Sequence, residues 1–290
     1  MYVQNATHFI QANKKSWILP DVLINSVKNT VKNKLIKFRQ SLVFTGFWLI
    51  STYSFPVYSF DCISDQIDEY AVVKQVYDGD TVKLTNGKKV RLIGINTPEI
   101  NYKTGNPEPY AKKAKYFLQQ KVLKQKIGLR FGNDKKDRHG RFLAHIFLRD
   151  KINLQQALLK NGLAVNIAIP PNLWQQDCYL NAEKEARRLR KGIWENHNQN
   201  IIDAQQIKSA QTGFQFVKGT VMEINEDKKT IWLKLSNKMS LRIFKKNLVY
   251  FNNMNIKRLK NKRIIARGWV NRYKKRYHIT IGHPNALQLL

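Results

Sequence analysis

Cysteine and acidic residues are scarce in this chain. Only Cys62 and Cys178 occur among 290 residues, too few for a disulfide framework or for a zinc site made of cysteines alone. Unpaired thiols are the default expectation, and a bond between the two is the alternative if the chain is exported. The 20 Asp and Glu stand against 51 Lys and Arg, which gives a net charge of +31. Such a field attracts polyanions, of which nucleic acid is the natural partner, although anionic membrane surface or cell-wall polymer would feel it too.

Charge is also missing from one stretch near the N-terminus. No Asp, Glu, Lys or Arg occurs from Gln40 to Phe60, and this apolar stretch follows the basic run Lys28–Arg39. A basic segment, an apolar segment and then small residues near Val57–Ser59 are the order of a secretory signal. Residues 1–60 therefore predict a signal that is removed on export, with a secreted, periplasmic or cell-envelope location. The alternative is a retained membrane anchor over residues 41–60, with transient membrane association.

Apolar residues are not lacking elsewhere, since 43% of the chain is hydrophobic and its length suits about two domains. This composition excludes a disordered polycation. The expected organisation is a first domain over 70–196, a polar linker over 197–212 and a basic module over 213–290.

Three short segments carry the chemistry of the first domain. The segment Asp78–Thr81 is followed by Arg91–Glu99, and Asp137–Arg141 comes later. They supply oxygen ligands for a hard cation, a carboxylate that could activate water, and two guanidinium groups that match phosphate oxygens. Taken singly, each segment has a plainer interpretation. Asp-Gly is a common hairpin turn, Thr-Pro-Glu is a common turn or helix start, and arginines in so basic a chain usually lie at the solvated surface. Their ordered combination favours a site that cuts phosphodiesters.

With these motifs in this order, residues 70–196 resemble the staphylococcal nuclease family. The resemblance implies that Asp80, Asn96 and the Thr97 carbonyl hold Ca²⁺, and that Asp78 supports the site without binding the metal directly. It also implies that Glu99 activates the attacking water and that Arg91 and Arg141 grip the phosphate and stabilise the transition state. The implied reaction is cleavage of DNA and RNA that leaves a 3′-phosphate.

The chain departs from the family pattern in its substrate contacts and in one ligand. The family usually has an aspartate where this chain has Asn96, and an amide oxygen brings no charge, so we expect weaker calcium binding. Arg138 and His139 stand where the family has a lysine and a tyrosine near the nucleotide, and they remain substrate-binding candidates. The stretch Val165–Pro171 contains no tyrosine, although the family often places one there.

The pattern of apolar residues predicts a mainly β fold with helices, of the α+β barrel type. Alternating runs indicate five strands that would form an oligonucleotide/oligosaccharide-binding (OB) barrel. Helical spacing and glycines at helix ends indicate three helices. The expected strands are Tyr70–Tyr77, Thr81–Leu84, Val90–Ile95, Ile127–Phe131 and Arg141–Leu148, and the helices are 109–124, Leu154–Lys160 and Gln176–Lys191.

The C-terminal region predicts a second small OB-like β domain of five strands. Gly213–Leu290 contains 18 Lys and Arg against 3 Asp and Glu, a net charge of +15. It has no second set of the catalytic motifs, so we expect binding without chemistry. The candidate substrate-binding cations are Arg272, Lys274, Lys275 and Arg276. Aromatic residues such as Trp232 and Trp269 could stack bases, and an equally good interpretation places them in the core.

Two functions follow from this sequence. The first is an exported, calcium-dependent, sugar-nonspecific endonuclease that acts on DNA and RNA. The second is a nucleic-acid-binding protein of the same fold that is catalytically weak or inactive. No protein partner is implied by the sequence.

Overall fold

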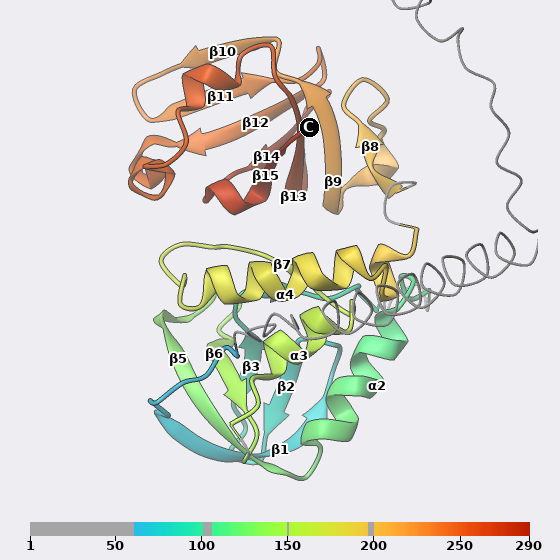
Figure 1. The fold of residues 1–290 in the computed structure, drawn as a ribbon, viewed down its shortest axis with the longest axis vertical. Coiled ribbons are helices and arrows are strands. Elements are labelled where there is room, and N and C mark those ends of the chain that lie inside the picture. The colour runs from blue at the N-terminus through green and yellow to red at the C-terminus, as the bar shows by residue number, and fades with distance from the viewer. Residues whose placement is uncertain (1–60, 101–105, 150, 197–199) are drawn as a thin grey trace, which may run out of the picture. The chain divides into compact units, whose positions relative to one another are not determined.

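Five strands close into a barrel in the first half of the described chain (Figure 1). They are β1 (Glu69–Val76), β2 (Thr81–Leu84), β3 (Lys89–Leu92), β5 (Lys126–Lys136) and β6 (Phe142–Phe147), in the order β1-β2-β3-β6-β5. Apolar side chains that alternate along these strands fill the interior and are fully buried, as in Val73, Val82, Val90, Leu129 and Ile146. The mainly β fold with helices is thereby confirmed.

The computed structural model describes residues 61–100, 106–149, 151–196 and 200–290. These residues belong to one unit of the chain. The predicted secretory signal or anchor over residues 1–60 lies outside the described residues. Among the helices that the structure describes, none has the length and apolar character needed to cross a membrane.

Among the described residues three helices cover the barrel, and their apolar faces follow the predicted spacing. They are α2 (Ala111–Val122), α3 (Leu154–Lys160) and α4 (Gln176–Arg188). In α2, the residues that recur every three or four positions are buried, namely Ala111, Ala114, Leu118 and Val122. Burial of this stripe against the barrel stabilises the helix, because a helix of twelve residues is marginal alone.

A pair of very short strands shapes the chain near the motifs. In β4 (Ile95–Asn96) and β7 (Val165–Asn166), Ile95 pairs with Asn166 and Asn96 with Val165, in antiparallel register. Asn96 is 5% exposed, so its amide is presented from a rigid, buried position. The pairing joins two segments that lie about seventy residues apart in sequence.

The two cysteines form a disulfide, which corrects the default expectation of free thiols. Cys62 and Cys178 are bonded, with Cα atoms 5.8 Å apart and a sequence separation of 116. Cys62 is 1% exposed and belongs to the core of the first barrel. The bond ties the segment before β1 to helix α4.

The C-terminal region forms a second, larger sheet. Its path is β10 (Glu223–Glu226), β11 (Thr230–Lys234), β12 (Met239–Phe244), β14 (Arg276–Thr280), β13 (Arg263–Tyr273), β9 (Gly213–Thr220) and β8 (Ile202–Asp203), with β15 (Leu287–Leu289) also paired to β13. Within the described residues this sheet has eight strands, against the five that the sequence predicts.

The second sheet encloses its own core, and residues of the expected linker contribute to it. Strand β8 lies within the stretch 197–212, where Ala204 is fully buried and Ile207 is 4% exposed. The buried cluster also includes Val217, Leu233, Leu241 and Ile279. The few apolar residues in this polar stretch follow no clear period, so sequence pattern alone does not reveal their burial.

A buried ion pair links helix α4 to strand β13. The Glu183 carboxylate accepts from Arg267 Nη1 at 2.5 Å and from Arg187 Nη2 at 3.0 Å, and it also accepts the Asn166 amide. Glu183 is 1% exposed and Arg267 is 8% exposed. Two arginines and a backbone amide therefore compensate a carboxylate that would otherwise be costly to bury.

Candidate active site

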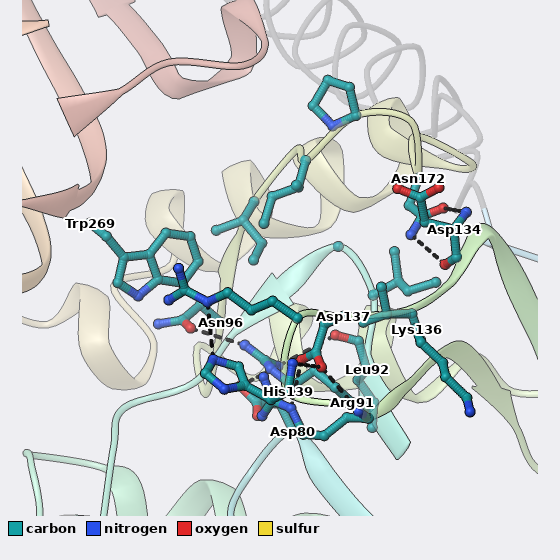
Figure 2. A pocket seen from close by; sticks show the side chains of 18 of the residues that line it. Asp80, Arg91, Leu92, Asn96, Asp134, Lys136, Asp137, His139, Asn172 and Trp269 are labelled. Carbon is teal, nitrogen blue, oxygen red and sulfur yellow. Dashed lines mark hydrogen bonds and ion pairs between the residues drawn. The ribbon is translucent and has the colours of Figure 1, made fainter. Parts of the chain in front are cut away.

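The motif residues line one cavity of about 640 Å³ (Figure 2). Strand β3 supplies Arg91, the turn before β2 supplies Asp78 and Asp80, and the segment after β4 supplies Glu99. The loop between β5 and β6 contributes a basic group that also lines the cavity: Arg138, His139 and Arg141. Residues that are sixty positions apart in sequence thus meet around one space.

The turn that carries Asp80 requires a glycine. The Asp78 carboxylate accepts the Asp80 amide at 3.0 Å, which closes a local side-chain turn. A Cβ atom on Gly79 would lie 2.6 Å from the Ala114 side chain and 2.8 Å from that of Thr97. Asp78-Gly79 is therefore both a turn and a structural part of the site, so the two interpretations from sequence are compatible.

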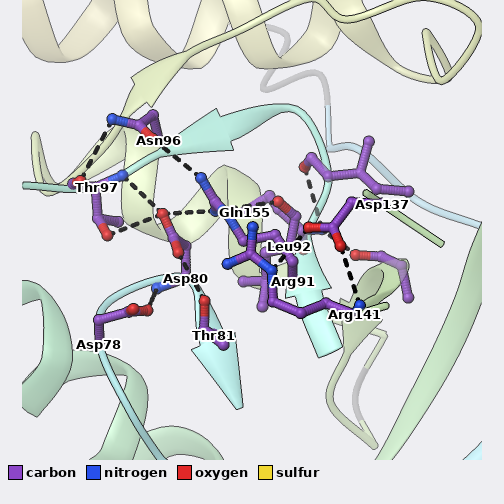
Figure 3. A network of polar contacts seen from close by, with 12 residues as sticks. Asp78, Asp80, Thr81, Arg91, Leu92, Asn96, Thr97, Asp137, Arg141 and Gln155 are labelled. Carbon is purple, nitrogen blue, oxygen red and sulfur yellow. Dashed lines mark hydrogen bonds and ion pairs between the residues drawn. The ribbon is translucent and has the colours of Figure 1, made fainter. Parts of the chain in front are cut away.

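Asp80 is the centre of a buried polar network (Figure 3). Its Oδ2 atom accepts from the Thr97 amide at 2.9 Å and from the Thr97 hydroxyl at 3.0 Å, and it pairs with Arg91 Nη1 at 2.5 Å. Its Oδ1 atom accepts from the Thr81 hydroxyl at 3.1 Å. These bonds hold the carboxylate in one orientation.

Arg91 joins the oxygens that the resemblance assigns to a metal. Its Nη2 donates to Asn96 Oδ1 at 3.0 Å, and its Nη1 donates to the Leu92 carbonyl at 3.4 Å. The residue is 9% exposed and is paired with Thr81 across the β2–β3 ladder. The guanidinium is therefore held rigidly at the cavity wall.

The oxygen donors of this network fit a hard cation. Asp80 and Asn96 both direct an oxygen to the same cationic group, the Arg91 guanidinium. No group of three or more His, Cys, Asp or Glu side chains that could hold a metal occurs within the described residues. A cation here would take neutral oxygens together with carboxylate, which is the mixed oxygen set that Ca²⁺ accepts.

Two carboxyl groups near this network, those of Asp78 and Glu99, have raised pKa values. Burial and the neighbouring Asp80 charge raise the pKa of Asp78 to about 7. The pKa of Glu99 is also raised, first by loss of water around its carboxyl and then by Asp80. A nearby positive charge would stabilise the ionised form of carboxyl groups in such surroundings.

Glu99 reaches the cavity from a short paired segment. Its amide donates to the Glu108 carboxylate at 2.8 Å, and its carbonyl accepts the Glu108 amide at 2.9 Å. The positive charges of Arg91 and Arg141 both act on its carboxyl and partly oppose the rise in its pKa. The carboxyl and the two guanidinium groups therefore share one electrostatic environment.

Asp137 positions Arg141 and was not among the predicted site residues. The Asp137 carboxylate accepts from Arg141 Nε at 2.7 Å and from the amides of His139 and Arg141 at 2.9 and 3.0 Å. Burial acts to raise the pKa of Asp137, but these hydrogen bonds outweigh it and the pKa is lowered. An Asp that opens a turn before a Gly at φ +76° is the signal that could have revealed it.

The remaining predicted contacts fall into two groups. Arg138 and His139 line the cavity, with Arg138 Nε 3.1 Å from His139 Nε2. The four cations Arg272, Lys274, Lys275 and Arg276 lie at the β13–β14 hairpin and do not line it. Residues of the same two strands do, namely Trp269, Asn271 and Thr280. Asn271 and Thr280 carry no motif, so sequence reasoning missed them.

The barrel brings a buried carboxylate–arginine pair, a second carboxyl and a second arginine to one cavity, a set of groups that suits phosphodiester hydrolysis. A sequence model described as "Staphylococcal nuclease homologue" matches residues 89–196. The chain is 36% identical to a thermonuclease of Staphylococcus intermedius over 135 residues, which cover 46% of this chain and 80% of the relative. It is also 36% identical to a thermonuclease of Staphylococcus hyicus over 130 residues, covering 44% of this chain and 76% of the relative.

A third relative is named as an endonuclease. Endonuclease YncB of Bacillus subtilis is 36% identical over 122 residues, which cover 40% of this chain and 57% of that protein. This chain belongs to the staphylococcal nuclease family, and it is a nuclease, a hydrolase that acts on nucleic acid.

Proposed function

We propose that this protein is an exported, calcium-dependent endonuclease that hydrolyses both DNA and RNA and leaves 3′-phosphate ends. The observation that supports this most is the convergence of Asp80, Arg91, Glu99 and Arg141 around one cavity. Each group has a chemical task in cutting a phosphodiester, and the cavity brings those tasks to one place. The order of basic and apolar segments in residues 1–60 supports export or, as the alternative, a membrane anchor.

The two arginines bind the phosphate and stabilise the charge that grows on its oxygens as a fifth oxygen bonds to phosphorus. Asp80 and Asn96 orient the Arg91 guanidinium, and Asp137 orients that of Arg141. Groups held in advance need no reorganisation during the reaction, so they favour the transition state over the bound substrate.

Glu99 accepts the proton of the attacking water. Its raised pKa makes it a better proton acceptor than an ordinary carboxylate. The proton moves to a Glu99 carboxylate oxygen as the water oxygen bonds to phosphorus, and the 5′ oxygen leaves.

The residues that would hold Ca²⁺ are Asp80, Asn96 and the Thr97 carbonyl, with Asp78 behind them. The bound ion would supply positive charge beside the phosphate oxygens. Because Asn96 contributes no charge, and because its oxygen accepts from Arg91, we expect weak calcium binding.

Arg138 and His139 at the cavity rim contact the nucleotides on either side of the cut. Four hairpin cations bind the nucleic acid at a distance from the scissile bond: Arg272, Lys274, Lys275 and Arg276. Four like charges close together repel each other unless a polyanion neutralises them.

One observation favours a second candidate, a weak or inactive nucleic-acid-binding protein. Arg91 pairs directly with both Asp80 and Asn96, so these oxygens are already neutralised in part. Nicking of supercoiled plasmid by the purified protein distinguishes the two, with millimolar calcium in one arm and chelator in the other. The endonuclease requires nicked and linear products that depend on calcium, whereas intact plasmid in both arms, together with retained DNA binding, identifies the binder.

A further inference from the structure

The outer face of the second sheet carries a row of aromatic and basic side chains. Along β11, Ile231 and Leu233 are buried while Trp232 between them is half-buried. The same alternation on β12 leaves Arg242 outward. On β14 and β13 it leaves Thr280 and Trp269 outward. Because side chains of a strand alternate between its faces, these four residues share the face opposite the core.

Strand register places these four side chains in one line across the sheet. Trp232 pairs with Arg242, and Arg242 pairs with Thr280. The pairing of Val270 with Ile279 puts Trp269 opposite Thr280. Arg242 Nη2 and Nε donate to Thr280 Oγ1 at 2.8 and 3.2 Å, so the middle of the row is also hydrogen-bonded. Adjacent strands lie about 4.8 Å apart, so the row from β11 to β13 extends about 14 Å.

The two indole rings at the ends of the row are held in place. Trp232 Nε1 donates to Asp227 at 3.3 Å, and its ring meets His278 edge-on at 6.0 Å between centroids. Trp269 meets Phe214 edge-on at 5.2 Å and is 39% exposed. A fixed ring with an open face is what base stacking requires, since little rotational freedom is lost on binding.

The row joins two cavities. One has a volume of about 770 Å³ and is lined by Trp232. Its lining also includes one acidic residue, Glu223, and four cations: Lys234, Lys238, Arg242 and Arg276. The other is the catalytic cavity, which is lined by Trp269 and Thr280 together with Arg91 and Glu99. Figure 2 shows Trp269 among the side chains of that cavity. Arg242 and Thr280, which are bonded to each other, thus belong one to each cavity.

We propose that this row, Trp232–Arg242–Thr280–Trp269, binds single-stranded nucleic acid and leads it into the catalytic cavity. Bases stack on the two indoles. The phosphates between them are held by Arg242 and by the other cations of the 770 Å³ cavity, which are Lys234, Lys238 and Arg276. Stacking needs unpaired bases with free faces, which a duplex does not offer. The inference rests on the proposed function and names the form of substrate that the same site takes.

The binding test uses the full chain in chelator, so that nothing is cut. A fluorescein-labelled oligothymidylate of twenty nucleotides is the probe, measured by fluorescence anisotropy at fixed salt. Trp232→Ala and Trp269→Ala should each weaken its binding roughly 5- to 100-fold. Trp232→Phe should retain most of the affinity, because a phenyl ring still stacks.

The matched control is Tyr116→Ala, which removes an aromatic side chain 61% exposed on α2 that lines neither of these cavities. It should bind the probe like the parent protein. A thermal melt of each variant checks that the fold is kept. Unchanged binding in both tryptophan variants would overturn the proposal. So would an equal loss of affinity for a twenty-base-pair duplex, which would indicate contact with backbone alone.

A cleavage test examines whether the row leads to the active site. With calcium, Trp232→Ala should lower kcat/KM on the twenty-nucleotide strand and leave kcat/KM on a dinucleotide unchanged, because only the longer chain reaches Trp232. An equal fall on both substrates, or no fall on either, would overturn the connection. If no variant and no parent protein cuts any substrate while the binding losses are seen, the proposed endonuclease fails and the single-strand row stands.

Discussion

At the scale of single residues, the site depends on charged groups whose orientation is set by their neighbours. Asp80 is held by Thr97, Thr81 and Arg91, and the Arg141 guanidinium is held by Asp137. Glu99 differs from them, because its carboxyl meets the cavity while its backbone is anchored by Glu108. A group that moves a proton needs access to water, whereas a group that holds charge benefits from rigidity.

Replacement of the proton acceptor should separate catalysis from binding. Glu99→Gln keeps the size of the side chain and removes its basicity, so kcat should fall roughly 10²- to 10⁴-fold. DNA affinity measured in chelator should stay nearly unchanged. Glu185→Gln on the exposed side of α4 is the matched control and should be fully active. A Glu99→Gln enzyme with near-parental rate would remove Glu99 as the base.

The contact between Asp137 and Arg141 predicts a coupled pair. Asp137→Ala frees the guanidinium to leave its position, and misplacement of a catalytic group by about 1 Å can lower the rate about 10²-fold. In an Arg141→Ala background the same change should have little further effect, because its target is already gone. Steady-state kinetics of the two single variants and the double variant measure this coupling. Additive losses would show that Asp137 acts through something other than Arg141.

Buried His145 predicts a loss of stability in mild acid. Burial, aided by the nearby Arg130 charge, lowers the pKa of His145 to about 3, from an ordinary value of 6.5. Below pH 6.5 this histidine is protonated in the unfolded chain but stays neutral in the folded protein. The free energy of unfolding therefore falls as pH drops from 6.5 toward 3, by up to about 1.4 kcal/mol per pH unit. Urea unfolding at pH 7, 6, 5 and 4 should show a shallower fall for His145→Gln. Parallel curves would contradict this account.

At the scale of elements, the molecule joins segments that are distant in the chain. The Cys62–Cys178 bond ties the segment before β1 to α4, and the β4–β7 pair holds Asn96 against Val165. Glu183 links α4, β7 and β13 through one buried carboxylate. The last two links each involve an element that lines the catalytic cavity, β4 in one case and β13 in the other.

The disulfide should stabilise the first barrel by restricting the unfolded chain. It encloses a separation of 116 residues, and its loss should lower the free energy of unfolding by about 2–4 kcal/mol. Urea unfolding of Cys62→Ala/Cys178→Ala against the parent protein measures the effect. The parent protein in reductant should match the double variant. Midpoints that coincide in all three samples would show that the bond contributes nothing.

At the scale of the whole molecule, positive charge dominates. The chain carries +31, and about half of that excess lies in Gly213–Leu290. The charge raises association rates with any nucleic acid, while the cavities and the aromatic row select what is bound productively. The long-range field and the short-range contacts therefore have separate roles.

The hairpin cations predict a measurable change in salt dependence. The test variant carries Gln at the four hairpin positions Arg272, Lys274, Lys275 and Arg276. The slope of log affinity against log salt concentration should become less steep, by about 0.9 for each phosphate that these side chains no longer neutralise. The matched control changes an equal charge at four exposed lysines that line neither cavity: Lys74, Lys112, Lys121 and Lys124. The control should keep most of the slope. Equal slopes for the two variants would show that the hairpin has no special role in binding phosphate.

Several features could be predicted because their signals are local. Alternation along β2, the three- and four-residue spacing in α2 and the Asp-Gly turn before Asp80 each involve residues a few positions apart. Sequence pattern was less useful where burial is isolated, as for Ala204 and Ile207, or where a residue has no distinctive type, as for Asn271 and Thr280. Such residues acquire their surroundings from segments far away in the chain.

The sequence by itself determined the charge of the molecule, the mainly β fold and the set of chemical groups available for phosphodiester cleavage, because each follows from composition or from short-range pattern. Only the tertiary structure decided that the two cysteines pair, that Asn96 lies against Val165, and that Trp269 borders the same cavity as Glu99. The reason is physical: closing a barrel and stacking sheets brings distant segments within a few ångströms, and no local pattern records which side chains then meet.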